Sequence, residues 1–403
     1  MFKEIKLLDI ESQVIELDNL SCLKPFSDEI IEFLNSLSIK FLSLNNSQQL
    51  PELTVLGFWL RKSNILNIKK NYNYKNKNKT QVSRGLVFQI PPSNVNSISI
   101  YSWALSLLAG NKNVIRISKT KSQQMHTICM VLEDILRDPE WLNISQRNKF
   151  FVYEYEDQIN EYLSSKCDLR VVWGGDRTVK KIRKFDLMSY ATEINFPDKF
   201  SISIININKF SKIDEATRLE IVKNFMNDSY WFDQMACSSP RILIWLSTSE
   251  LDQSIKNDFW KKLNFFLQDS EKKLTTIDSI NKQVASDRIS IELPDSKVIN
   301  HEDRLITRIS INEIIVKNEI MPGAGFFYEC EISKLEEIIP ILNRKLQTIS
   351  YYGFNSQEWR DFITNNNIKG IDRIVPIGKA LDFEEVWDGT DLISSFLREI
   401  TIR

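Results

Sequence analysis

The chain has 403 residues, of which 42% are hydrophobic and 26% are charged, a composition typical of a soluble globular protein with two or three domains. Its 52 Lys and Arg residues nearly balance its 53 Asp and Glu residues, for a formal net charge of −1. This balance excludes recruitment of nucleic acid or an anionic membrane by overall charge.

The numbers and positions of the cysteines and histidines limit the kinds of site that the chain can form. The five cysteines are odd in number, far apart and never in a CxxC pair, which argues against a disulfide framework and a metal site and favours a reducing cytoplasm. Charged residues interrupt the N-terminal segment, which therefore predicts neither a signal peptide nor a membrane-spanning helix. Only two histidines, His126 and His301, are available as a catalytic base.

The first part of the chain, residues 1–84, mixes short helical patterns such as SDEIIEFLNSLSIKFL with polar segments. The stretch KKNYNYKNKNKTQVSR is rich in lysine, but a basic run without a matching fold motif is usually a solvated loop, and we interpret it as one. We expect this N-terminal region to pack on the domain that follows it.

From residue 85 onward, short strands alternate with helices. Strands are predicted at GLVFQI, NVIRI, KFFVYEY and DLRVVWGG, and helices at SISIYSWALSLLAG, SQQMHTICMVLEDILR and DRTVKKIRK. Such alternation is typical of βαβ units with a parallel sheet. Residues 85–207 are therefore predicted to form one α/β domain.

A second α/β pattern follows. It contains the helices DEATRLEIVKNFMNDS and SIKNDFWKKLNFFLQDS and the strands PRILIWL, GFFYECEI, QTISYYGF and DRIVPIG. We predict a second domain over residues 208–403 with its own sheet and core, so the expected fold class is α/β with two domains.

Two turns follow predicted strands, although the GxGxxG fingerprint is absent. In IPPSNVNS, Asn94 stands just before a helix, and its residue type alone favours a turn or cap role. In WGGDRT, Gly174 and Gly175 end a strand and open a helix. This second turn suits an anion-binding backbone and a tight packing turn equally well.

Cys237 lies in DQMACSSPRILIWL, directly before a predicted strand. Nearby N–H groups at such a junction can stabilise a thiolate, but cysteine is among the most often buried residues, so residue chemistry alone favours a buried Cys237. The spacing of His126 and Cys129 along an apolar helical face favours packing over a catalytic pair.

Five segments, taken together and in order from about residue 50 to the C-terminus, resemble the acyl-CoA reductase family typified by LuxC, the reductase subunit of the bacterial bioluminescence fatty acid reductase complex. They are IPPSNVNSISIYSWALSLLAGNKNVIRIS, VVWGGDRTVKKIR, DQMACSSPRIL, LQTISYYGF and GIDRIVPIGKALDFEEVWDG. That family is similar to the aldehyde dehydrogenase superfamily. The resemblance implies an NADP-binding α/β domain and a catalytic α/β domain around a cleft.

The resemblance also implies roles for individual residues. Cys237 becomes the acylated nucleophile, and Asn94 becomes an oxyanion donor beside the Cys237 backbone N–H. Lys119 stands where NAD-preferring members carry an acid, and a cation there favours the 2′-phosphate of NADPH over NADH. The residues that the resemblance brings to the cofactor are Arg116, Ser118, Lys119, Gly174, Gly175, Asp176 and Thr178.

The implied activity is NADPH-dependent reduction of a long-chain fatty acyl thioester, either acyl-CoA or acyl-protein, to the aldehyde through an S-acyl-cysteine. Hydrolytic members of the superfamily have a glutamate near the position of Asn195, so its replacement should slow hydrolysis of the acyl-enzyme. A fatty acyl-CoA or acyl-carrier thioester is the expected partner. The resemblance also allows a LuxE-like acyl-protein synthetase and a homo-oligomer.

Two alternatives stay open on sequence. The chain could be a catalytically silent acyl-binding or assembly component, or a cysteine acyltransferase or thioesterase that forms the same acyl-enzyme without hydride transfer.

Overall fold

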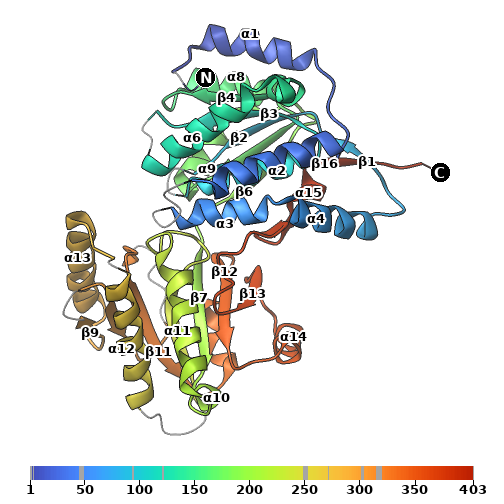
Figure 1. Ribbon diagram of the computed structural model, residues 1–403. Coiled ribbons are helices and arrows are strands. Elements are labelled where there is room, and N and C mark those ends of the chain that lie inside the picture. The colour runs from blue at the N-terminus through green and yellow to red at the C-terminus, as the bar shows by residue number, and fades with distance from the viewer. Residues whose placement is uncertain are drawn as a thin grey trace. The chain divides into compact units, whose positions relative to one another are not determined.

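The computed structural model describes residues 2, 4–44, 50–92, 95–119, 122–247, 253–270, 272–300, 304–314 and 320–402. The chain forms two compact α/β units, the first from residues 1–198 and 383–403 and the second from residues 199–382 (Figure 1). The expected α/β class is confirmed.

A five-stranded sheet forms the centre of the first unit, and every pair of neighbouring strands in it is parallel. In spatial order the strands are β4 (Asn148–Val152), β3 (Lys112–Ile117), β2 (Leu86–Ile90), β5 (Leu169–Trp173) and β6 (Thr192–Phe196). All residues of β2 and β5 are buried, as expected for parallel strands with both faces covered. The strand order reverses at β2, which therefore marks the topological switch point of the sheet.

Helices connect the strands of this sheet. Three of them match the predicted helices SISIYSWALSLLAG, SQQMHTICMVLEDILR and DRTVKKIRK, whereas residues 142–146 and 157–166 were not predicted to be helical. The connecting helices are α5 (Ser97–Leu108), α6 (Gln123–Leu136), α8 (Asp157–Lys166) and α9 (Asp176–Ile182), with α7 (Leu142–Gln146) before β4. Every residue of α5 is buried, in agreement with a sequence that contains no charged residue.

The N-terminal residues form helices that pack on this unit. They are α1 (Leu7–Asp18), α2 (Asp28–Leu42), α3 (Pro51–Trp59) and α4 (Lys62–Lys75). Ile10, Val14 and Leu17 of α1 belong to the same hydrophobic cluster as Leu86 and Phe88 of β2.

The loop predicted for KKNYNYKNKNKTQVSR is wrong in part. Its first residues continue α4 to Lys75, and Thr80–Ser83 form strand β1. Tyr72 explains the difference, because its ring lies 5.1 Å from the ring of Phe26 and its hydroxyl donates to Gln81. Tertiary packing of one aromatic side chain thus stabilises a helix that polar composition disfavoured.

The C-terminal residues return to the first unit. Strand β16 (Leu397–Ile400) pairs with β1 in antiparallel register, Asn111 Nδ2 donates to Phe396 O at 2.9 Å, and the Phe383 ring stacks on Tyr101 at 5.0 Å. Residues 383–403 therefore belong to the first unit, whereas the sequence assigned 208–403 to one domain. The difference arises because pairing partners distant in sequence are invisible to local patterns.

A seven-stranded sheet forms the centre of the second unit, and only its edge strand β9 runs antiparallel. In spatial order the strands are β13 (Arg373–Pro376), β12 (Leu346–Tyr352), β7 (Phe200–Asn206), β8 (Pro240–Leu246), β11 (Phe326–Ile332), β10 (Thr307–Ser310) and β9 (Lys297–Asn300). Alternate residues of β8 enter two different hydrophobic clusters, Ile242 and Ile244 in one and Leu243 and Trp245 in the other. The sheet therefore has a core on each face.

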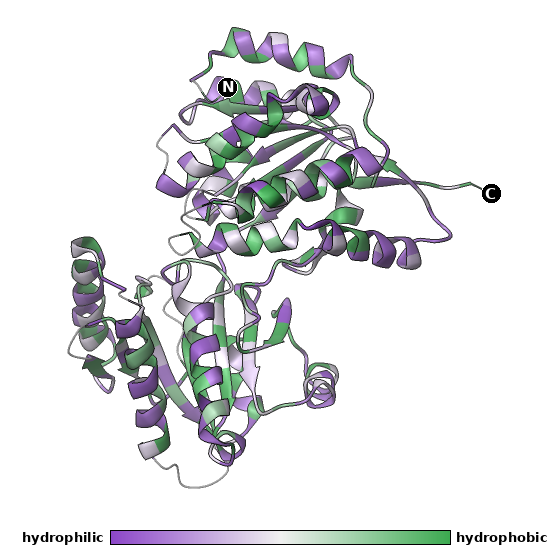
Figure 2. Cartoon of the chain, in the orientation of Figure 1, coloured by the Kyte–Doolittle hydropathy of each residue, from purple (hydrophilic) through white to green (hydrophobic). Residues whose placement is uncertain are grey.

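Helices α11 (Glu215–Tyr230) and α12 (Gln253–Asp269) bury their apolar sides in the cluster that contains Trp245. Helices α13 (Thr276–Glu292) and α14 (Ser356–Asn365) contribute to the opposite cluster. Along α12 the buried residues recur every three or four positions, and hydrophobic and hydrophilic segments alternate on its ribbon (Figure 2).

A buried carboxylate holds the last segment of the second unit. Asp228 on α11 is 1% exposed, and it accepts hydrogen bonds from the N–H groups of Gly378 at 2.7 Å and Ala380 at 3.1 Å. Arg373 donates to the carbonyls of the same segment, including Ala380 O at 3.1 Å. Burial raises the pKa of Asp228 from 3.8 to about 7.

We predict a pH-dependent stability difference between the wild type and Asp228→Asn. Because the folded state favours the neutral acid, the contribution of Asp228 is fully present below pH 3.8 and declines as the pH rises through about 7. The difference in unfolding free energy should change by at most about 1.4 kcal/mol per pH unit in this window, measured by urea denaturation. Asp295→Asn, at an exposed position, is the control; a constant difference from pH 5 to 8 would contradict the assignment.

Candidate functional site

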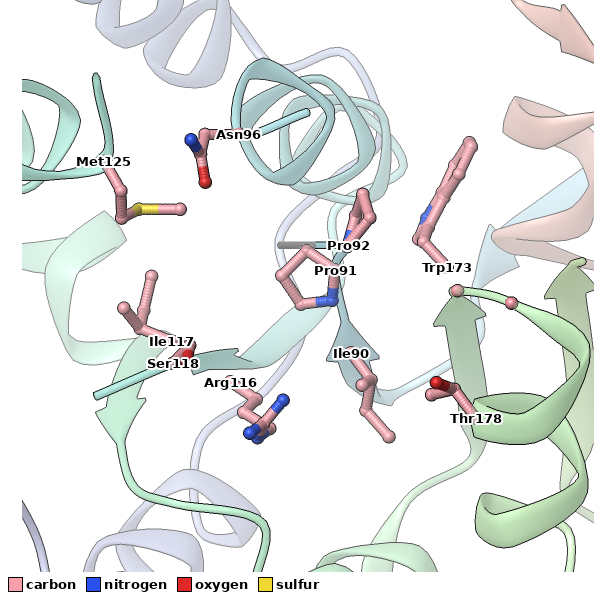
Figure 3. Close-up of a pocket in the computed structure, with 12 residues that line it drawn as sticks. Ile90, Pro91, Pro92, Asn96, Arg116, Ile117, Ser118, Met125, Trp173 and Thr178 are labelled. Carbon is pink, nitrogen blue, oxygen red and sulfur yellow. The ribbon is translucent and has the colours of Figure 1, made fainter. Parts of the chain in front are cut away.

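A pocket of about 370 Å³ lies in the first unit, at the carboxyl ends of the strands on either side of the switch point. Ile90, Pro91 and Pro92 come from the end of β2, Arg116, Ile117 and Ser118 from the end of β3, Trp173, Gly174 and Gly175 from the end of β5, and Asn96, Met125 and Thr178 from the adjoining helical segments (Figure 3). Open α/β sheets bind ligands at this place because the loops on either side of the reversal diverge there.

Five of the seven predicted cofactor residues line this pocket, namely Arg116, Ser118, Gly174, Gly175 and Thr178. Lys119 is exposed, and its ammonium group forms an ion pair with Glu4 at 3.1 Å. Asp176 opens α9 but is not among the lining residues. The roles of all seven residues toward a cofactor stay predictions.

The two glycines of the WGGDRT turn allow close approach. A Cβ atom at Gly175 would lie 2.7 Å from Asp198 Oδ2, and one at Gly174 would lie 3.1 Å from Thr178 Cγ2. Asp198 also accepts from the N–H of Asp176 at 3.0 Å. Packing therefore accounts directly for Gly175, while both glycines also border the pocket.

Asn96 is a pocket residue that sequence reasoning missed. Its amide donates to Ser122 Oγ at 2.6 Å and to Gln124 Oε1 at 2.9 Å, which ties the start of α5 to the start of α6. The only sequence signal was a second asparagine in IPPSNVNS. Asn94, the predicted oxyanion donor, lies outside the described residues.

Cys237 lies in the second unit, in the turn between α11 and β8, and its side chain is exposed. The expectation of a buried cysteine from residue chemistry alone is therefore wrong. The other four cysteines are buried or half-buried. Burial raises the pKa of both Cys167 and Cys330 to about 12, so these thiols are poor nucleophiles near neutral pH.

A buried glutamine anchors the turn that carries Cys237. Gln234 adopts a left-handed conformation with φ of 62°, and its side chain is fully buried. Its Oε1 accepts from the N–H groups of Gly325 and Phe326, both at 3.0 Å, and its Nε2 donates to Pro240 O at 2.9 Å. The turn is thus tied to the starts of both β11 and β8.

A second polar contact comes from the sheet below the turn. Ser201 Oγ donates to the carbonyl oxygen of Cys237 at 2.6 Å and accepts from Thr348 N–H at 3.1 Å. Ser201 is fully buried on β7. Sequence reasoning missed both Ser201 and Gln234. Neither residue type indicates that its side chain holds the backbone of a segment elsewhere in the chain.

Arg241 gives the Cys237 turn a positive charge. Burial lowers the pKa of Arg241 to about 10, and the charge interaction with Cys237 opposes that shift. Its Nη1 donates to Met321 O at 2.8 Å. This charge interaction brings the Arg241 guanidinium group into the surroundings of Cys237.

His126 is exposed on α6 whereas Cys129 is buried, so the expectation that both pack on one apolar face holds only for Cys129. Within the described ranges, no group of three or more His, Cys, Asp and Glu side chains could hold a metal ion. None of the described helices combines the length and apolarity needed to cross a membrane.

The two sheets define the class of protein. The chain has the aldehyde dehydrogenase fold, as three solved structures illustrate. Glyceraldehyde-3-phosphate dehydrogenase GapN from Methanocaldococcus jannaschii, complexed with NADP, matches 99% of this chain and 95% of its own at 11% identity and a TM-score of 0.63. An NAD-dependent benzaldehyde dehydrogenase from Corynebacterium glutamicum matches 98% and 90% at 13% identity and a TM-score of 0.64. PnpE from Pseudomonas sp. WBC-3 matches 98% and 89% at 13% identity and a TM-score of 0.68.

Within this fold the chain belongs to the acyl-CoA reductase (LuxC) family, whose model matches residues 20–399. The expected family is therefore confirmed. Family and fold together identify an oxidoreductase that reduces acyl groups to aldehydes. No curated protein matches the chain.

We predict that Gln234→Ala lowers the free energy of unfolding by about 2–4 kcal/mol, because two N–H groups and one carbonyl are left without their partner in a buried turn. Urea denaturation measures the effect. Gln283→Ala, on the exposed side of α13, should change stability by less than about 0.5 kcal/mol. Equal effects of the two substitutions would show that Gln234 does not anchor the turn.

Proposed function

We propose that the protein reduces a long-chain fatty acyl thioester to the aldehyde with NADPH, through an S-acyl intermediate on Cys237. The observation that carries this proposal is the exposure of Cys237 on a turn anchored by Gln234 and Ser201 and bordered by the cation of Arg241. Family membership supports acyl reduction in general.

The chemistry begins at the Cys237 sulfur. Its thiolate attacks the thioester carbonyl carbon, the new C–S bond forms, and the thiolate of coenzyme A or of a carrier leaves, so that the acyl group is bound to the enzyme. Bound NADPH supplies the hydride that converts this acyl group to the aldehyde level. The Cys237 thiolate then leaves as the C–S bond breaks and the aldehyde forms.

Asn94 and the Cys237 backbone N–H are proposed to stabilise the oxyanion of the tetrahedral intermediates. A donor of this kind typically contributes about 10²–10³-fold to the rate. Arg241 assists the first step by favouring the thiolate.

The region near Asn195 supports slow hydrolysis of the acyl-enzyme. An amide cannot accept a proton from water as a carboxylate base can, and Asn195 Nδ2 donates to Glu193 Oε1 at 2.6 Å. Burial raises the pKa of Glu193, but hydrogen bonds from Asn195 and Arg183 and the charge of Arg170 outweigh it and hold the pKa below its ordinary value. Glu193 is therefore a weak base.

The pocket of the first unit fits a dinucleotide cofactor. Gly174 and Gly175 let the backbone approach a ligand closely, and Arg116 and Ser118 offer polar groups at the end of β3. We propose that these residues and Thr178 hold NADPH, with Lys119 and Asp176 at its border. NADH is the less favoured cofactor because the end of β3 carries cations and no acid.

The proposed donor is a fatty acyl-CoA or an acyl-carrier thioester in a bacterial cytoplasm, as for a long-chain acyl-protein thioester reductase. A LuxE-like acyl-protein synthetase is the proposed protein partner, and a homo-oligomer is compatible with the proposal.

We predict that Cys237→Ala abolishes aldehyde formation from a long-chain acyl-CoA, by about 10³-fold or more, because no other exposed thiol can replace the nucleophile. NADPH oxidation and aldehyde release measure activity, and intact-protein mass spectrometry without NADPH measures the acyl adduct. Cys22→Ala is the control. A thioesterase would form the adduct without NADPH oxidation, a silent homologue would do neither, and full activity in Cys237→Ala would exclude this nucleophile.

We predict that Lys119→Glu lowers the ratio of kcat/KM for NADPH to that for NADH by about 10-fold, because a carboxylate repels the 2′-phosphate and accepts from a ribose hydroxyl. Steady-state kinetics with each cofactor measure the ratio. Lys70→Glu, on an exposed position of α4, is the matched charge control. An unchanged ratio would remove Lys119 from the cofactor site.

A further inference from the structure

Two cations and two tyrosines form a cluster beside the pocket of the first unit. Arg116 Cζ lies 5.4 Å from the ring centre of Tyr153 and 5.7 Å from that of Tyr155. Lys181 Nζ lies 3.3 Å from the ring centre of Tyr155. Tyr155 thus brings together a cation from the end of β3 and a cation from α9.

Two polar atoms of this cluster are buried without a hydrogen-bond partner among the described residues, namely Arg116 Nε and the Tyr155 hydroxyl. Buried polar groups are nearly always hydrogen-bonded, so each such atom requires an explanation. Burial raises the pKa of Tyr155 to about 12, and the hydroxyl therefore keeps its proton at neutral pH. Both groups can donate, and together they call for an acceptor that bears negative charge.

The position of the cluster indicates which acceptor it suits. Arg116 lines the pocket at the end of β3, and Thr178, one helical turn before Lys181, lines the same pocket from α9 (Figure 3). In dinucleotide-binding α/β sheets, an acid on the strand next to the first βα turn binds the ribose 2′-hydroxyl, and an arginine there accommodates a 2′-phosphate. Here that strand end carries Arg116.

Two acids also lie near the cluster. Asp157 Oδ1 lies 3.8 Å from Lys181 Nζ, and Asp157 and Glu156 both act on the neighbouring tyrosines. Within the described ranges, no carboxylate lies at ion-pair distance from Arg116, whose nearest aromatic neighbours are Tyr153 and Tyr155. A phosphate would therefore meet the Arg116 guanidinium, which has no carboxylate at ion-pair distance among the described residues, and the Lys181 ammonium group, which forms an ion pair with Asp157 at 3.8 Å.

We propose that Arg116, Lys181 and the Tyr155 hydroxyl form a phosphate subsite that takes the 2′-phosphate of the adenosine ribose of NADPH. The inference rests on the cofactor part of the proposed function and is independent of its acyl chemistry. It adds Lys181 and Tyr155 to the residues that are proposed to select the cofactor.

The test is isothermal titration of the full chain with three nucleotide fragments that lack nicotinamide. The fragment 2′,5′-ADP carries the phosphate of NADPH, 5′-AMP lacks it, and 3′,5′-ADP carries the phosphate of coenzyme A. The wild type should bind 2′,5′-ADP at least about 10-fold more tightly than either of the others. Lys181→Met should weaken 2′,5′-ADP by about 10-fold and leave 5′-AMP unchanged, and Tyr155→Phe should weaken it by about 3-fold.

Lys180→Met is the matched control, because Lys180 is exposed on the same helix, and it should leave all three affinities unchanged. Circular dichroism of each variant separates local loss of binding from unfolding. Equal weakening of 2′,5′-ADP and 5′-AMP by Lys181→Met would overturn the proposal, as would discrimination that survives Lys181→Met and disappears in Lys119→Glu. An effect confined to 3′,5′-ADP would assign the cluster to coenzyme A and likewise overturn it.

Failure of this inference and failure of the proposed function give different results. If the preference for 2′,5′-ADP over 5′-AMP depends on Lys181 but no thioester is reduced, the phosphate subsite is supported and the proposed activity is contradicted. If NADPH-dependent reduction occurs and Lys181→Met leaves fragment binding unchanged, the activity stands and the subsite does not.

Discussion

The parallel pairing of the first sheet is the constraint on which its candidate site depends. Parallel strands all end at the same edge, and the reversal of strand order at β2 separates the loops that follow β3 and β5. The pocket forms at that separation. A one-residue change in the register of β3 would turn Arg116 to the other face of the sheet. Arg116 would then neither line the pocket nor contact Tyr153 and Tyr155.

In the second unit, the exposed Cys237 lies on a turn whose backbone is held in place by buried side chains. Turns that project from a sheet have few partners for their backbone groups, and such turns are usually mobile. Here Gln234 and Ser201, both fully buried, bind the turn from below. Cys237 is exposed although its backbone carbonyl is held by Ser201, a combination that suits the proposed nucleophile.

Sequence patterns recovered most of the first unit because its signals are local. Continuous apolar runs such as LVFQI and amphipathic runs such as QQMHTICMVLEDIL each specify an element without reference to the rest of the chain. Local patterns gave wrong predictions where contacts with residues distant in sequence determine the secondary structure. Tyr72 extends a polar helix through Phe26, and β16 returns to β1 across more than three hundred residues. The candidate site shows the same division, because the family resemblance indicated the Gly-Gly turn and Cys237, whereas no motif in the sequence indicated Asn96, Gln234 or Ser201.

The sequence by itself determined the α/β class, the family resemblance and five residues of the pocket, and it predicted Cys237 as the nucleophile, because each depends on residue type at a strand end or on an ordered set of motifs. Only the tertiary structure decided that Cys237 is exposed, that Lys119 pairs with Glu4, and that Arg116 and Lys181 share Tyr155. Exposure, ion pairing and ring contacts depend on which elements meet in space. That information resides in long-range packing, to which no local pattern of residues has access.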